Sequence, residues 1–85
     1  MKYKGYHSEH QLPIRRGEQV VIPKGVTVHT THPKRDTYVT ARKQRVTVDH
    51  ILPGRSEGGR HLENPKVRWA GSGGYWCEVD INNLA

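Results

Sequence analysis

The sequence predicts an all-β fold: a small antiparallel β-barrel of about five strands, with a C-terminal hairpin and an irregular N-terminal arm. Three observations lead to this prediction. The apolar residues are mostly Val, Ile, Leu, Trp and Tyr, which are typical of strands. Short runs of alternating apolar and polar residues recur along the chain, separated by Gly and Pro. A chain of 85 residues, of which 33% are hydrophobic, has material for one small core.

The chain begins with a segment that lacks strand character. Residues 1–17 are predicted to form an irregular basic arm, because Pro13 and Gly17 interrupt any long helix and apolar residues are few. Residues 18–85 are predicted to form the single barrel domain.

The domain opens with two predicted strands, Gln19–Ile22 and Val26–Thr30, on either side of a turn. Gly25 in that turn is expected to adopt a positive φ, as a type II geometry requires. Residues 31–36 are polar and without periodicity, so they are predicted to form an exposed loop, which a short run over residues 37–41 follows.

The longest strand candidate covers residues 43–52. One face carries Val46, Val48, His50 and Leu52, and the other carries Arg45, Thr47, Asp49 and Ile51. The pattern therefore predicts that the His50 ring is partly buried on the first face. Residues 55–65 follow as the longest stretch without strand character, and are predicted to be a mobile loop.

Residues 64–84 give the strongest pattern in the chain. Two alternating runs flank a glycine cluster, which predicts a β-hairpin in which Trp69 faces Cys77, Arg68 faces Glu78 and Val67 faces Val79. A shift of one residue would mix the apolar and charged faces, so this register is strongly preferred. In it Trp69 is buried and Trp76 is more exposed. Residues 80–84 suit a short 3₁₀ turn.

Short strands, tight turns and a polar loop in each half are what a strongly bent barrel of the SH3-like kind requires. An OB-type barrel is the nearest alternative, but it usually needs more residues and a helix. The single Cys77 excludes an internal disulfide, and no apolar run approaches a membrane span. The sequence therefore predicts a cytoplasmic chain that needs no membrane.

Lys and Arg outnumber Asp and Glu by 14 to 8, which favours polyanions or acidic protein surfaces as partners. The excess lies mid-chain, near Tyr38. The predicted binding residues are the mid-chain cations and one exposed aromatic residue, namely Arg35, Arg42, Lys43, Arg45 and Trp76. In such a surface, cations contact phosphates and a flat ring stacks on a base. The same residue types are also enriched at protein interfaces.

Residues 48–65 resemble the opening of an HNH nuclease site. By that resemblance, Asp49 would ligate a divalent metal, His50 would act as general base and Asn64 would orient it. The family also needs a following helix with a second ligand, whereas this chain continues with Pro65 and a strand pattern. His7 and His10, and His29 and His32, are spaced like metal ligands, but solvent-exposed histidines are the simpler interpretation. No metal or cofactor is predicted.

Residues 20–80 include the segments V-I-P-K-G-V-T-V-H-T-T-H-P, R-V-T-V-D-H-I-L-P-G and N-P-K-V-R-W-A-G-S-G-G-Y-W-C-E-V-D. In these segments the sequence resembles small proteins encoded by bacteriophages of actinobacteria, a group whose function is not established. The resemblance implies a phage accessory protein acting inside a bacterial host. We therefore expect a non-enzymatic module that binds DNA or RNA. The alternatives are a module that binds or inhibits an acidic host protein, and an HNH-like metal-dependent nuclease.

Overall fold

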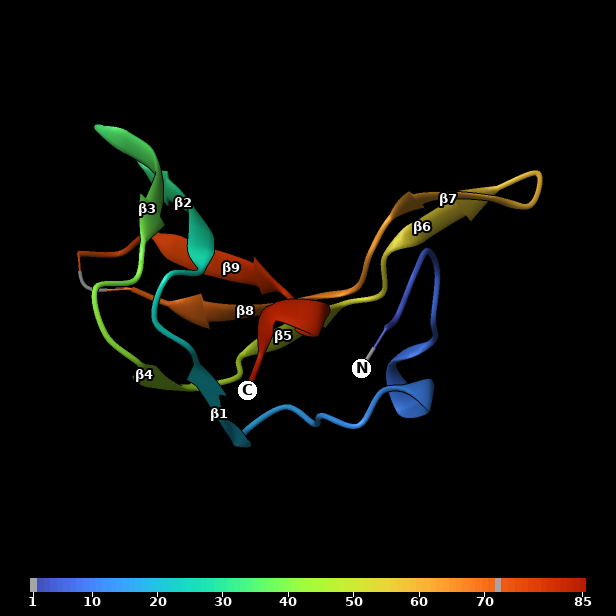
Figure 1. Ribbon diagram of the computed structural model, residues 1–85, viewed down its shortest axis with the longest axis horizontal. Coiled ribbons are helices and arrows are strands. Elements are labelled where there is room, and N and C mark those ends of the chain that lie inside the picture. The colour runs from blue at the N-terminus through green and yellow to red at the C-terminus, as the bar shows by residue number, and fades with distance from the viewer. Residues whose placement is uncertain (1, 72) are drawn as a thin grey trace.

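The computed structural model describes residues 2–71 and 73–85, and the fold in them is all-β (Figure 1). Apart from two 3₁₀ turns, η1 and η2, the elements are strands. In chain order they are η1 (Glu9–Gln11), β1 (Gln19–Ile22), β2 (Thr27–His32), β3 (Arg35–Val39), β4 (Gln44–Thr47), β5 (His50–Leu52), β6 (Arg55–Glu57), β7 (Arg60–Glu63), β8 (Lys66–Ala70), β9 (Trp76–Asp80) and η2 (Ile81–Asn83). No helix in the described residues is long and apolar enough to cross a membrane.

The strands form three antiparallel sheets. The central sheet has the order β3-β2-β9-β8-β5, and the other two are the pairs β1-β4 and β6-β7. The predicted all-β antiparallel class is confirmed, but the sheets do not close into one barrel. The short β1-β4 pair lies across the core from the central sheet, and the β6-β7 hairpin projects from the opposite end of the molecule (Figure 1).

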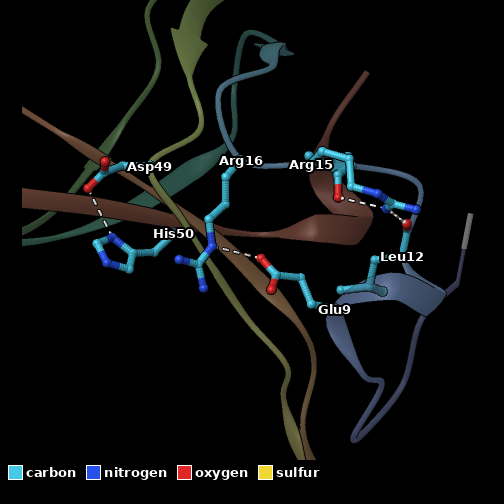
Figure 2. A network of polar contacts seen from close by, with 7 residues as sticks. Glu9, Leu12, Arg15, Arg16, Asp49 and His50 are labelled. Carbon is cyan, nitrogen blue, oxygen red and sulfur yellow. Dashed lines mark hydrogen bonds and ion pairs between the residues drawn. The ribbon is translucent and has the colours of Figure 1, made fainter.

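The core lies between the central sheet and the β1-β4 pair. Its buried hydrophobic residues are Leu12, Ile14, Ile22, Val28, Val48, Ile51, Val67, Trp69, Cys77, Val79 and Ile81. Two of them, Leu12 and Ile14, come from the N-terminal segment, which carries the 3₁₀ turn η1 and is packed on the domain. In this segment Arg16 pairs with Glu9 and Arg15 donates to the Leu12 carbonyl (Figure 2).

The hairpin of β8 and β9 has the predicted register. Trp69 pairs with Cys77, Arg68 with Glu78 and Val67 with Val79. Trp69 is 5% exposed and Trp76 is 36% exposed, so the predicted contrast between the two indoles is confirmed. The Arg68 guanidinium contacts the Glu78 carboxylate at 3.1 Å on the outer face. The predicted 3₁₀ turn is present as η2.

The predicted strand over residues 43–52 is wrong in one respect, because the chain changes sheets within it. β4 pairs with β1, and β5 pairs with β8. Val48 and Ile51 are both buried although they are three residues apart, so the alternation shifts by one residue between them. His50 consequently lies on the outward face, away from Val48, and its side chain is 48% exposed. The prediction that its ring is partly buried on the face of Val48 is wrong.

Two segments predicted as loops are hairpins. Residues 31–36 extend β2 to His32 and begin β3 at Arg35, with only Pro33 and Lys34 between the strands. Residues 55–63 form β6 and β7 around Gly58 and Gly59, and every strand residue there is exposed. Cross-strand pairs between opposite charges, such as Arg55 with Glu63, replace the apolar alternation that would have marked the strands.

The turn between β1 and β2 fixes where the β3–β4 connection begins. Gly25 has a φ of 83°, as predicted, and its amide donates to the Thr40 carbonyl. The buried Thr40 hydroxyl donates to the Pro23 carbonyl at 2.6 Å and accepts from the Val26 amide at 3.0 Å. Because these bonds hold Thr40 in place, β3 and β4 leave it in defined directions on two sides of a groove.

Candidate nucleic-acid interface

An open groove of about 540 Å³ lies between β3, β4 and the loop that joins β8 to β9. Trp69 and Cys77 from the core contribute to its lining, and Tyr38, Tyr75 and Arg45 line it nearer the surface. Burial raises the pKa of the Cys77 thiol, so the thiol stays protonated and acts there as a small apolar group. The groove thus has an apolar base and polar walls.

Tyr38 forms one wall of the groove. It lies opposite Val28 in the β2-β3 ladder, so the alternation of β3 turns its ring to the core side of the sheet. Its hydroxyl donates to Gln44 Oε1 at 3.4 Å. Burial, reinforced by Cys77, raises the pKa of the Tyr38 phenol, and the ring therefore carries no charge near neutral pH.

Tyr75 also lines the groove, and its ring packs close to Gly71. The Gly71 amide donates to the Tyr75 carbonyl at 2.8 Å, which closes the loop between β8 and β9. A Cβ atom on Gly71 would lie 2.5 Å from Cε2 of the tyrosine ring, so a larger residue there would displace the ring from its present position. The ring also packs against His32 in a T-shaped contact with centroids 4.9 Å apart.

A second hollow of about 300 Å³ adjoins the groove and shares Tyr38 and Tyr75 with it. Thr30, His32, Lys34 and Arg35 complete its lining. The two tyrosines therefore separate two hollows, with cations from the β2–β3 hairpin on one side and Arg45 on the other. We call Lys34, Arg35, Tyr38, Arg45 and Tyr75 the tyrosine strip.

The predicted cations are distributed along this strip and beside it. Arg35 lines the second hollow and Arg45 lines the groove. Arg42 and Lys43 are exposed in the connection that leads into β4, next in the chain to Gln44 and Arg45, but they line neither hollow. Asp36, the acidic residue within the basic stretch, is exposed and also lines neither of them.

Trp76 does not join these cations. It lies opposite Ala70 at the start of β9, on the outer face of the central sheet, whereas Tyr38 is on the core side. Its indole packs in a T-shaped contact with His50, with centroids 5.5 Å apart, and it borders a small outer hollow of about 60 Å³ beside Arg68 and Glu78. The predicted site is therefore divided between two faces of one sheet.

The residues of the nuclease-like pattern are also separated by their contacts. His50 Nδ1 and Asp49 Oδ2 are 2.9 Å apart, and both side chains are about half exposed (Figure 2). Asn64 instead donates to Asp80 Oδ2 at 2.9 Å and accepts from the Gly5 amide at 3.4 Å. Strand β8 follows it, where the nuclease pattern has a helix.

Within residues 2–71 and 73–85, no three side chains among His, Cys, Asp and Glu are grouped so that they could hold a metal ion. The two histidine pairs singled out by spacing make other contacts. His32 accepts from the Lys34 amide at 3.1 Å through Nδ1 and packs on Tyr75, and His7 packs on Tyr3.

Comparison with protein-family models, with curated proteins and with solved structures gives no match. The assignment of a candidate binding site therefore depends on the geometry and charge of this chain.

Sequence reasoning found most of the cations of the strip but missed Tyr75. Tyr75 follows the glycine cluster of the hairpin turn, where the alternation pattern predicts no face for a side chain. One signal was available: Tyr75 is two residues before the buried Cys77, so continued alternation from β9 turns it to the same side. Its approach to Tyr38 depends on β3 and β9 both pairing with β2, which sequence periodicity does not specify.

Proposed function

We propose that the chain is a non-enzymatic module that binds nucleic acid through the tyrosine strip, with Arg42 and Lys43 extending its positive charge. The observation that carries this proposal is the placement of Lys34, Arg35 and Arg45 on two sides of a pair of partly buried tyrosine rings. Cations in this arrangement neutralise phosphates, and flat rings between them provide stacking surfaces. The net charge of +6 favours association with a polyanion.

Fluorescence anisotropy with labelled oligonucleotides of mixed sequence, at low and at physiological salt, tests this proposal. We expect affinity to fall steeply with salt, with a log-log slope of roughly −2 to −3 for three phosphate contacts. Arg45→Gln should weaken binding of every sequence similarly and reduce the slope by about one unit, because one phosphate contact is lost. The double change Arg42→Gln and Lys43→Gln should reduce it further.

Arg60→Gln is the matched control. It removes the same charge from an exposed residue of β7, at the opposite end of the molecule from β3 and β4 (Figure 1). We expect it to leave the slope nearly unchanged. Absence of binding at low salt, or equal losses in the Arg45 and Arg60 variants, would contradict the proposed site.

A second candidate function is supported by Trp76. This residue is 36% exposed on the outer face and contacts His50, so it offers a flat apolar anchor for a protein partner. On this proposal the module would bind an acidic host protein. Trp76→Ala would then abolish capture of that partner without unfolding the domain, and binding would be insensitive to the tyrosine strip.

From the sequence resemblance alone, we further propose that the module is a phage accessory protein acting in the cytoplasm of a bacterial host. An SH3-like relationship of its strands is proposed on the same sequence grounds. Neither proposal is needed for the binding site, which depends only on the residues of the strip and their surroundings.

A further inference from the structure

The two tyrosine rings of the strip are recessed. Both are partly buried, and each borders two hollows, so a ligand must enter a concavity to reach their faces. Convex cationic surfaces contact the phosphates of any nucleic acid. Recessed rings contact only groups, such as unpaired bases, that can turn out of the strand and enter the hollow. The larger hollow, at about 540 Å³, has the size of sites that enclose small organic groups.

We infer that the strip selects unpaired nucleic acid, with one base in each hollow against Tyr38 and Tyr75 and the phosphates along Lys34, Arg35 and Arg45. This inference rests on the proposed function and names the class of nucleic acid that the site accepts. In a duplex the base faces are covered by their neighbours and only the edges are open in the grooves. A single strand exposes its base faces, and stacking on an aromatic ring requires no particular sequence.

Charge within the groove separates the place of the base from the place of the phosphate. Asp49 is among the residues that line the groove, so its negative charge disfavours a phosphate there, while its carboxylate contacts His50 Nδ1 at 2.9 Å. Gln44 lines the same groove and offers amide groups to a base edge. The sugar-phosphate chain is therefore expected to run outside, on the side of Arg45 and Lys34.

The chemistry of the rings agrees with this assignment. The raised pKa of Tyr38 keeps its phenol neutral, so no charge on the ring opposes a polyanion. His32 packs against Tyr75 in a T-shaped contact, and Tyr75 lines both hollows. Tyr38 contacts Gln44 and Tyr75 contacts His32 before a ligand arrives, which limits the conformational entropy that is lost when a base stacks.

Anisotropy titrations of labelled single strands and of the same sequences as duplexes test the inference at one fixed salt concentration. We expect the single strand to bind at least about tenfold more tightly than the duplex, since stacking contributes to the single strand alone. Single-stranded DNA and RNA are both measured, because base stacking is common to them. Equal affinity for single strand and duplex would overturn the inference.

Ring substitutions make the test residue-specific. Tyr75→Leu keeps an apolar side chain in the loop but removes the flat ring, and should weaken single-strand binding roughly 5- to 150-fold while leaving duplex binding unchanged. Tyr6→Leu is the control: it removes a ring that is 57% exposed and lies outside the strip, and it should leave single-strand binding unchanged. Circular dichroism of each variant establishes that it is folded.

The result with Arg45→Gln separates the two proposals. One outcome is that Arg45→Gln lowers the affinity for both single strand and duplex while Tyr75→Leu leaves both affinities unchanged. In that case the strip binds nucleic acid by charge alone, so the proposed function stands and the inference of base stacking fails. If neither single strand nor duplex binds the parent protein at low salt, both fail.

Discussion

Trp69→Ala is expected to unfold the domain. Trp69 is 5% exposed, packs within the core and lines the base of the groove, so its removal leaves a cavity bounded by β-strand residues that are fixed in the sheet. Truncation of a buried Trp costs about 3 to 5 kcal/mol. Small domains are stable by about 5 kcal/mol at the lower end of the usual range, so most of the free energy of unfolding would be lost. Urea denaturation followed by far-ultraviolet circular dichroism measures this loss.

Trp76→Ala is the matched control for that substitution. The two indoles belong to the same hairpin, but Trp76 is 36% exposed and lies on the outer face, where solvent can fill the space that it leaves. We expect its cost to be less than half that of Trp69→Ala. A Trp69 variant that unfolds at the urea concentration of the parent would show that the hairpin does not pack as described.

Gly54→Ala is expected to have the second largest effect on stability. Gly54 connects β5 to β6 with a φ of 79°, a region that costs a residue with a side chain about 1 to 3 kcal/mol. An added Cβ would also lie 2.5 Å from the Gly5 carbonyl oxygen, 2.7 Å from that of Glu63 and 2.9 Å from the Pro65 nitrogen. All three are backbone atoms, so rotation of a side chain cannot relieve the contacts.

Gly25→Ala separates the two contributions. Gly25 has a φ of 83°, but no atom outside its immediate neighbours lies within 4 Å of an added Cβ. This variant therefore carries the conformational cost without the clash. Thermal unfolding of both variants, monitored by circular dichroism, should give a clearly lower midpoint for Gly54→Ala. Equal midpoints would contradict the close approach of the N-terminal segment to Gly54.

The parts of the fold that the sequence predicts are those in which one face is buried and the other is polar. The β8-β9 pairing shows this contrast, because a shift of one residue in either direction would bury a charge beside Val67 or Val79. The turn at Gly25 is predictable for a different reason: glycine there provides the positive φ that the turn needs.

Alternation fails as a guide where it changes phase. Val48 ends the run that faces the core from β4, and Ile51 starts a new run in β5, so His50 takes the outward side. The β6-β7 hairpin lacks alternation because both its faces are exposed. Only its glycine pair, between two short polar runs, indicated a turn.

The sequence indicates which stretch of the chain carries the candidate site, but it does not indicate which side chains share a face there. A basic stretch is visible in the sequence, and β3 and β4 do bring Arg35 and Arg45 to the same pair of adjoining hollows. Trp76 lies on the other face from Tyr75, because the two are neighbours in the chain and neighbours on a strand face opposite ways. Tyr75, and not Trp76, is on the side of those cations.

Chemical-shift mapping of the ¹⁵N-labelled protein, titrated with a short single-stranded oligonucleotide, tests the central claim most directly because it reports the bound surface residue by residue. The account predicts that amide resonances of Tyr38, Arg45 and Tyr75 shift together and saturate at one affinity, while those of Trp76 and of β7 change little. Shifts centred on Trp76 and His50, or confined to the β6-β7 hairpin, would contradict it.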